Sequence, residues 1–352
     1  MSQKINYFVT YFTSEFTEIG VVSIKRFLYF HPDTLGKVYC FDENSREILS
    51  KLIDSPKVTV ENVQKSKSLT TILGDLVKDR SLLEAIISIK PLLLLQCITE
   101  CRLEDTLIYF DPDVMFYSPI SIENMCTSSF MVYEQKGISS ESIQNYGRYN
   151  AGIVLVKNNS QGNEILRLWQ DHCLQWCRLE VENHRYADQK YLDYLSGLPG
   201  FTSSCSWSSN LSARAFNKQE REIDIRKSEA YIYVNGEMLE SFHFHGLRYS
   251  NNAILTGFNR FGSLRPRGRL FFYVYLPVIF NVFETSKNLM ALKLDVHREN
   301  LAALDKTMIY ERPESRFPIN AIVMLFRMLR LSRIPSFPIY LIIRIRQLLW
   351  NR

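Results

Sequence analysis

The sequence feature that most constrains the fold is a regular alternation of strand-like and helix-like segments at the start of the chain. Residues 6–12, 37–41 and 57–63 are rich in the β-branched and aromatic residues that favour strands. Residues 20–29 and 45–52 lie between them and repeat apolar side chains at helical spacing. A helix between two strands carries the chain back, so that the second strand runs in the same direction as the first. We therefore expect an α/β fold with a mainly parallel sheet wrapped by helices.

The α/β pattern continues through the middle of the chain. Residues 80–99 are apolar on most faces, so we expect a buried helix that Pro91 breaks into two pieces. Residues 163–178 are expected to form another helix. Further strands are expected at residues 106–110, 130–134, 151–157, 231–234 and 241–243.

The C-terminal quarter of the chain differs in composition. Residues 269–283 form an aromatic and aliphatic run that Pro277 interrupts, and we place a domain boundary near residue 265. This boundary divides the chain into an α/β domain, residues 1–265, and a helical C-terminal extension, residues 266–352.

The tail of the extension, residues 318–352, combines apolar residues with six arginines and contains no lysine and no acidic residue. The formal net charge of the chain is +5, so the remainder is near −1 and lacks the basic excess of nucleic-acid-binding proteins. We expect short helices at residues 321–332 and 339–350 that lie on an anionic membrane surface. A helical pair packed on the domain or on a dimer partner is the alternative.

Cysteine usage and hydropathy bear on the location of the protein. The seven cysteines are odd in number and show no Cys-x-x-Cys spacing, which favours reduced thiols in the cytoplasm. Residues 1–7 show no secretory signal, and no apolar, uncharged run reaches the length of about 18 residues that a spanning helix needs. We therefore expect a cytoplasmic protein that is peripheral on the inner face of the cell membrane.

The strongest local signal is the pair Asp111 and Asp113, which directly follows the strand expected at residues 106–110. Open α/β sheets bind ligands beyond the carboxyl ends of their strands. Two hard oxygen ligands at this place suit Mg²⁺ or Mn²⁺ bound to a diphosphate. The alternative is a solvated turn, because Asp-Pro-Asp is also favourable turn chemistry.

A haloacid-dehalogenase-like phosphatase with Asp111 as its nucleophile is a second alternative, because its nucleophile loop has a similar pattern. That fold carries the loop on its first strand, whereas three expected strands precede Asp111 here. No later lysine followed by a Gly-Asp pair stands in a matching place.

Three later segments make the aspartate pair more specific. They read YNAGIVLVKNN at residues 149–159, ADQKYLDYL at 187–195 and FHFHGLRY at 242–249. In this order the motifs resemble those of the retaining glycosyltransferases of the glycogenin and lipopolysaccharide-galactosyltransferase type, and of related bacterial polysaccharide glycosyltransferases. The resemblance covers roughly residues 5–250 and implies the GT-A fold, a Rossmann-like fold for nucleotide-diphospho-sugar transferases.

The resemblance implies a metal site with a DxD motif. Asp111, Asp113 and His243 look like the ligands, with His245 as the competing candidate for the third position. An imidazole ligand favours Mn²⁺ over Mg²⁺ as the cofactor.

The resemblance also implies roles in sugar transfer. Asp188 and Gln189 look like the catalytic pair near the anomeric carbon, although an aspartate in this place could instead cap a helix. The residues that look donor-binding are Thr10, Tyr11, Arg80, Lys90, Asp111, Asn150, Ala151, Gly152 and Arg248. The chain departs from the family pattern in lacking Lys-Pro-Trp after Gly246 and a stacking tyrosine after the first strand.

The implied protein is a metal-dependent glycosyltransferase of the hexosyltransferase kind. It would move a sugar from a nucleotide-diphosphate sugar, expected to be a UDP-sugar, to a saccharide or lipid-linked acceptor with retention. Such a reaction is typical of bacterial surface polysaccharide or lipopolysaccharide synthesis. A non-catalytic sugar-nucleotide-binding protein is the alternative from another class, and the complete set of Asp111, Asp113 and His243 argues against it.

Overall fold

The computed structural model describes residues 5–206, 209–212, 215, 223–250, 253–256, 268–291 and 315–318. The domain boundary predicted near residue 265 and the tail helices predicted at 321–332 and 339–350 lie outside the described residues.

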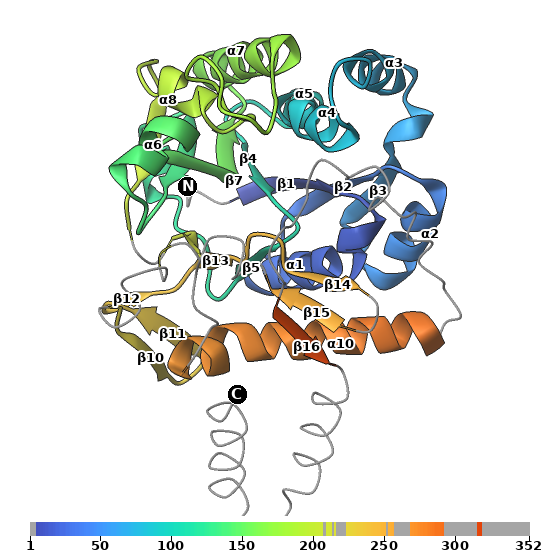
Figure 1. Ribbon diagram of the computed structural model, residues 1–352, viewed down its shortest axis with the longest axis vertical. Coiled ribbons are helices and arrows are strands. Elements are labelled where there is room, and N and C mark those ends of the chain that lie inside the picture. The colour runs from blue at the N-terminus through green and yellow to red at the C-terminus, as the bar shows by residue number, and fades with distance from the viewer. Residues whose placement is uncertain are drawn as a thin grey trace, which may run out of the picture.

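A seven-stranded sheet forms the centre of the molecule (Figure 1). The order of its strands is β3 (Val58–Asn62), β2 (Leu35–Cys40), β1 (Ile5–Phe12), β4 (Thr106–Phe110), β7 (Tyr149–Lys157), β6 (Phe130–Glu134) and β8 (Phe201–Ser204). All neighbours pair in parallel except β7, which is antiparallel to both β4 and β6. The mainly parallel α/β sheet predicted from the sequence is therefore confirmed.

Helices cover both faces of this sheet (Figure 1). On one face, α1 (Thr17–Phe30) and α2 (Glu43–Leu52) bury an apolar cluster that includes Phe8 and Phe110. The opposite face is covered by α3 (Lys67–Leu76), α4 (Leu82–Ser88), α5 (Lys90–Ile98), α7 (Ser160–Gln175) and α8 (Tyr191–Leu195). A further helix, α6 (Ser140–Tyr146), lies in the connection from β6 to β7.

Local sequence explains where several helices begin. Pro91 stands in the first turn of α5, where a missing N–H is tolerated, so the broken helix predicted for this region is α4 followed by α5. A capping box of Ser81 and Glu84 begins α4. The Asn159 side chain accepts a hydrogen bond from the N–H of Gly162, so α7 begins earlier and ends earlier than the sequence pattern predicts.

The later strands form three smaller sheets. In the first, β5 (Val114–Phe116) pairs antiparallel with β13 (Ser241–His243), which pairs in parallel with β9 (Leu211–Ser212). The second contains β10 (Ile225–Ser228), β11 (Tyr231–Val234) and β12 (Glu237–Met238), and the third contains β14 (Arg248–Ser250), β15 (Ala253–Thr256) and β16 (Ser315–Pro318). The first of these sheets brings the region after β4 next to a strand from late in the chain.

The described part of the C-terminal extension is mostly helical and packs on the α/β domain. A short helix α9 (Gly268–Leu270) and a π-helical turn (Phe271–Tyr275) lead into α10 (Leu276–Ala291). Val278, Ile279 and Val282 share a buried apolar cluster with Ile19 and Val22 of α1. Within the described residues, no helix combines the length and the apolar character that crossing a membrane requires.

Candidate active site

Two carboxylates and one imidazole meet just beyond the carboxyl end of β4. Asp111 and Asp113 lie in the turn between β4 and β5, and the β5–β13 ladder sets His243 opposite Val114. The candidate ligand atoms of these three residues all lie within 4.8 Å of one another. His243 Nε2 is 3.2 Å from Asp113 Oδ1 and 3.8 Å from Asp111 Oδ2.

The Asn150 side chain determines which nitrogen of the His243 ring faces the carboxylates. Asn150 Oδ1 accepts a hydrogen bond from the backbone N–H of Gly152 at 2.7 Å and from Asn210 Nδ2 at 3.1 Å. The same oxygen lies 3.2 Å from His243 Nδ1. Since this oxygen can only accept, Nδ1 carries a proton and donates to it, which leaves Nε2 as the nitrogen that faces the two carboxylates.

The residues of this cluster fit a divalent cation. His243 Nε2 and the oxygens of both carboxylates face one another, so a divalent cation that displaces the Nε2 proton would find three ligand atoms directed at it. Burial alone would raise the pKa of Asp113, but His243 and the N–H of Gly246 outweigh burial and hold this pKa below its ordinary value. The carboxylate is therefore kept in the charged form that binds a metal, and its combination with an imidazole suits Mn²⁺.

The loop after β13 holds Asp113 in place. The N–H of Gly246 donates to Asp113 Oδ2 at 2.5 Å, and the N–H of Phe244 donates to the Asp113 carbonyl oxygen at 3.0 Å. The ring of His245 stacks on the ring of His243 with their centroids 3.8 Å apart. Among the described residues, His245 is not part of the group whose ligand atoms converge.

A buried lysine connects this cluster to the segment that carries the predicted catalytic pair. Lys90, at the start of α5, is 4% exposed, and its Nζ lies 2.7 Å from Asp188 Oδ2 and 3.5 Å from Asp111 Oδ1. Lys90 Nζ also donates to the carbonyl oxygen of Ala151 at 3.2 Å. The Tyr109 hydroxyl donates to Asp111 Oδ1, the same oxygen that Lys90 approaches, so both groups hold this oxygen of Asp111.

Charge pairing keeps this lysine protonated. Burial by itself lowers the pKa of Lys90, but the carboxylates of Asp111 and Asp188 outweigh burial and hold that pKa well above its usual range. Burial raises the pKa of Asp188, and the charge of Lys90 opposes this effect. The alternative role for Asp188 as a helix cap is not realised, because α8 has Lys190 at its N-cap position and no side-chain cap.

The Asn-Ala-Gly motif supports the cluster through its backbone. The carbonyl oxygen of Gly152 accepts a hydrogen bond from the N–H of Asp111 at 2.8 Å, which extends the ladder between β4 and β7. A Cβ atom at Gly152 would lie 2.5 Å from His243 Cε1 and 2.7 Å from Asn150 Oδ1. Glycine is therefore required here because the imidazole ring packs against the backbone.

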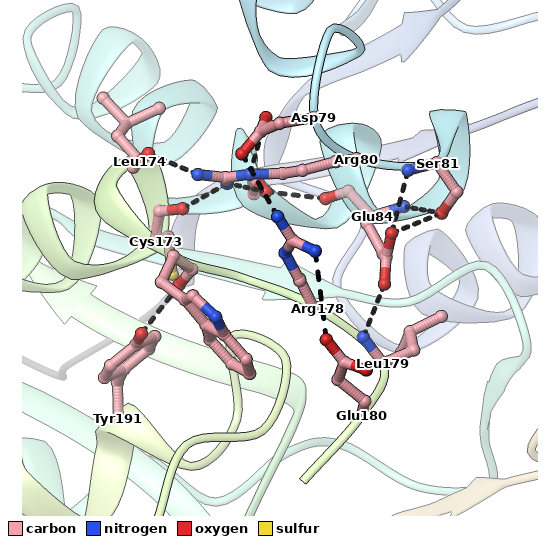
Figure 2. A network of polar contacts seen from close by, with 12 residues as sticks. Asp79, Arg80, Ser81, Glu84, Cys173, Leu174, Arg178, Leu179, Glu180 and Tyr191 are labelled. Atoms are coloured by element: carbon pink, nitrogen blue, oxygen red, sulfur yellow. Dashed lines mark hydrogen bonds and ion pairs between the residues drawn. The ribbon is translucent and has the colours of Figure 1, made fainter. Parts of the chain in front are cut away.

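Arg80 does not join the cluster, contrary to its expected position beside the donor. Its guanidinium donates to Ser88 Oγ, to the Cys173 carbonyl oxygen and to the Leu174 carbonyl oxygen (Figure 2). These carbonyl groups belong to the last turn of α7, where unpaired acceptors and the negative end of the helix dipole favour a cation. Arg80 thus joins α4 to the end of α7.

The remaining predicted residues occupy varied surroundings. Gln189 is partly buried, and its Nε2 donates to the carbonyl oxygen of Tyr146 at 2.8 Å. Thr10 and Tyr11 are buried within β1. Arg248 lies in β14, paired with Leu255, and its side chain is not among those that the structure describes.

A cavity that the sequence motifs did not predict lies beyond the carboxyl ends of β1, β2 and β3. Its volume is about 470 Å³. The described residues that line it are Thr13, Ser14, Phe41, Asp42, Asn44, Val63, Gln64, Thr70, Leu73, Gly74, Val77, Leu82 and Ile86. Neither Thr10 nor Tyr11 is among these lining residues. The aromatic Phe41, the last residue of the second expected strand, is the sequence signal that could have indicated this cavity.

Comparisons with known proteins give distant similarities. No family model matches the chain. Two Bacillus subtilis (strain 168) proteins are similar in sequence: uncharacterized protein YfnF, 26% identical over 60% of this chain and 71% of its own length, and uncharacterized protein YfnD, 22% identical over 59% and 67%.

Solved structures that resemble the chain are glycosyltransferases. The galactosyltransferase LgtC, in complex with donor and acceptor sugar analogs, is 14% identical, with 75% of this chain and 98% of LgtC covered and a TM-score of 0.44. Mouse xyloside xylosyltransferase 1 is 13% identical, with coverages of 68% and 97% and a TM-score of 0.43. GlyE of Streptococcus pneumoniae TIGR4 is 14% identical, with coverages of 83% and 64% and a TM-score of 0.44. The activity of this chain must therefore be argued from its own residues.

Replacing Asn150 with alanine is expected to weaken Mn²⁺ binding by about 10- to 100-fold, the usual effect of losing a group that orients a metal-binding histidine. Calorimetric titration of the protein with MnCl₂ measures the change. Asn163→Ala, on α7, removes a comparable hydrogen bond to Asn158 and serves as the control. Equal affinities for the two variants would contradict the orienting role of Asn150.

Proposed function

We propose that the protein is a metal-dependent glycosyltransferase that takes a sugar from a nucleotide-diphosphate sugar. The observation that carries this proposal is the convergence of Asp111, Asp113 and His243 beside the buried pair of Lys90 and Asp188. The group lies at the carboxyl end of β4 in a mainly parallel sheet, which is where such sheets bind ligands.

The three ligands would hold Mn²⁺, or Mg²⁺, against the diphosphate of the donor. A metal ion bound there supplies charge stabilisation to the departing diphosphate. Asp113, fixed by Gly246 and Phe244, and His243, fixed by Asn150, provide ligand atoms that are already oriented before the ion binds. This orientation reduces the reorganisation that binding would otherwise require.

Lys90 would fix the position of the metal-binding side of the site relative to the side where the acceptor is proposed to bind. Its ammonium bridges Asp111, on the metal side, and Asp188, on the side where the acceptor is proposed to bind. Burial raises the pKa of Asp188, but the charged Lys90 Nζ lies 2.7 Å from its Oδ2, so this carboxylate is held in an ion pair and is not free to act as a general base. An inverting reaction needs such a base, so the pairing supports transfer with retention, with Asp188 and Gln189 positioned near the sugar.

Anomeric proton NMR of the first-formed product is expected to show the configuration of the donor. The physical reason is the ion pair that restrains Asp188 from taking the acceptor proton. A product of opposite configuration would contradict transfer with retention but not the proposal that the protein transfers a sugar. The spectrum should be recorded before mutarotation, or with an acceptor that forms a stable glycoside.

The cavity beyond β1, β2 and β3 is suited to the nucleoside of the donor. Phe41 offers an aromatic face for stacking, and Thr13, Asn44 and Gln64 offer hydrogen-bonding groups. The cavity and the metal ligands lie at the same edge of the sheet, which supports a donor whose base and diphosphate would lie along that edge. We take UDP as the nucleotide because of the resemblance noted above.

Thr70→Trp is expected to weaken binding of UDP in the presence of Mn²⁺ by at least about tenfold, or 1.4 kcal/mol, because the indole would fill the cavity. Thr71→Trp, on the adjacent exposed position of α3 and outside the cavity lining, is the control. Both threonine hydroxyls donate to the carbonyl oxygen four residues earlier, so both variants lose this bond, and Thr70→Trp also loses the bond of Thr70 to the Gln64 carbonyl oxygen. Unchanged binding in Thr70→Trp would remove the nucleoside from this cavity.

A screen of nucleotide sugars is expected to find one that raises the melting temperature only when Mn²⁺ is present. A ligand at about 100 times its Kd adds about 2.7 kcal/mol of stability. Asp113→Asn should abolish this effect, and Asp171→Asn, an exposed position on α7, should retain it. Stabilisation of Asp113→Asn equal to that of the unchanged protein would contradict the metal-bridged donor.

The protein and the donor found in this screen also distinguish a transferase from the two alternatives, a non-catalytic binding protein and a phosphatase. Slow, metal-dependent hydrolysis of the stabilising donor without acceptor is expected of a transferase and not of a binding protein. A phosphatase that uses Asp111 would instead form a phospho-aspartyl intermediate. Tyr109 and Lys90 both contact Asp111, which leaves its Oδ1 engaged and argues against a nucleophilic role.

For its setting, we propose a saccharide or lipid-linked acceptor in surface polysaccharide or lipopolysaccharide synthesis. The support is the family resemblance together with the arginine-rich, apolar segment at residues 318–352. A position in the cytoplasm on the inner face of the membrane is part of the same proposal. The vesicle experiment below measures membrane binding directly.

A further inference from the structure

A second cavity lies apart from the candidate active site, against the later half of α1. Its volume is about 580 Å³. The described residues that line it come mainly from α1, from β11 and its neighbours, and from α10: Val22, Lys25, Arg26, Tyr29, Phe30, Tyr117, Lys227, Ala230, Ile232, Phe272, Tyr273, Pro277, Asn281, Glu284, Thr285 and Asn288. None of them belongs to the Asp111 cluster or to the nucleoside cavity.

The cavity is positively charged. Lys25, Arg26 and Lys227 line it, and Glu284 is the one acidic residue among its described lining residues. None of the three cations forms an ion pair with a carboxylate in the part of the chain that the structure describes. Their charges are therefore available to an anion that enters from solvent.

The arginine is held in position by the wall of the cavity. Arg26 Nε donates to the carbonyl oxygen of Phe116 at 2.7 Å, and its guanidinium lies 4.6 Å from the centre of the Tyr117 ring. These contacts leave the two terminal nitrogens of Arg26 for another partner and fix the orientation of its guanidinium group. A fixed guanidinium beside two flexible ammonium groups suits a phosphate group.

The rim of the cavity carries aromatic side chains. Tyr29 is 79% exposed, and Phe272 and Tyr273 are partly buried. Aromatic residues next to basic residues are typical of surfaces that lie at the headgroup level of a membrane. An isolated site for a soluble anion has no need of exposed aromatic rings.

The helix α1, which lines the cavity, also connects it to the sheet that precedes the basic, apolar tail. The helix α1 contacts both α10 and β14. The sheet of β14, β15 and β16 ends at Pro318, the first residue of the segment with six arginines and no acid. A membrane that received the tail would therefore lie near the sheet that borders α1.

We propose that this cavity binds the phosphate of an anionic lipid headgroup, with Lys25, Arg26 and Lys227 as its ligands. The lipid would fix the orientation of the domain on the membrane, which a tail attached at one point does not do. The proposal is independent of sugar transfer, because it is read out by lipid binding and uses no residue of the candidate active site.

The test is co-sedimentation of the full-length protein with vesicles of phosphatidylcholine alone or with added phosphatidylglycerol. The unchanged protein is expected to bind the anionic vesicles. The double variant Lys25→Glu/Lys227→Glu should lose about tenfold or more of its vesicle partition coefficient, since basic residues near the surface act additively. Lys25→Gln/Lys227→Gln should lose less, and Arg26 stays unchanged because its packing contributes to the fold.

The matched control is Lys67→Glu/Arg102→Glu. These two side chains are exposed, lie on α3 and before β4, and change the net charge by the same amount. Equal losses in the two charge-reversed variants, or no loss in either, would overturn the proposal, because net charge or the tail alone would then explain binding. Equal binding of the unchanged protein to both kinds of vesicle would also overturn it.

Inorganic phosphate distinguishes a soluble ligand from a lipid. Free phosphate would be the ligand, in place of a lipid, if two results were obtained together. Phosphate would raise the melting temperature of the unchanged protein at constant ionic strength, and the Lys25→Glu/Lys227→Glu variant would sediment with vesicles as the control variant does. Circular dichroism and melting temperatures of all variants confirm that the charge reversals leave the fold intact.

Discussion

The backbone pairing of β13 with β5 is the interaction on which the candidate active site depends. Its antiparallel register sets His243 opposite Val114, beside the turn that carries Asp111 and Asp113. A slip of one residue would turn the imidazole to the other side of the strand. Side-chain contacts alone do not hold this group together, because the carboxylates of Asp111 and Asp113 carry like charges that repel one another. The ladder, together with the N–H groups of Phe244 and Gly246, holds the ligands against that repulsion.

Buried charges connect this ladder to the opposite face of the sheet. Lys90 reaches from α5 to Asp111 after β4, to Ala151 in β7 and to Asp188 before α8. Burying charged groups is costly, and such groups persist where each has a partner. The network therefore makes the placement of Asp188 depend on the helix that carries Lys90. Arg80 and Glu84 reinforce the same connection from α4 to the end of α7 and to the backbone that follows it.

The sequence predicted the parts of the fold whose signals are local. Alternating strand-like and helix-like segments predicted the parallel sheet, and Pro91 predicted the break between α4 and α5. The resemblance to a glycosyltransferase family, rather than a local signal, implied that Asp111, Asp113 and His243 belong together, and their ligand atoms do converge. Arg80 was misplaced because its neighbours in sequence do not reveal that its guanidinium faces the end of α7. The cavity beyond β1, β2 and β3 was missed because its lining comes from segments after three separate strands and from α3 and α4.

The sequence by itself determined the class of fold, the carboxylates at a strand end and the apolar, arginine-rich tail, because periodicity, turn chemistry and charge are properties of neighbouring residues. Only the tertiary structure decided that Asn150 holds the ring of His243, that Gly152 makes room for it and that Lys90 pairs with Asp188. Only the structure, too, brought Lys25 and Lys227 to one cavity. These contacts join residues far apart in the chain, and their geometry depends on strand register and helix packing, which local patterns do not encode.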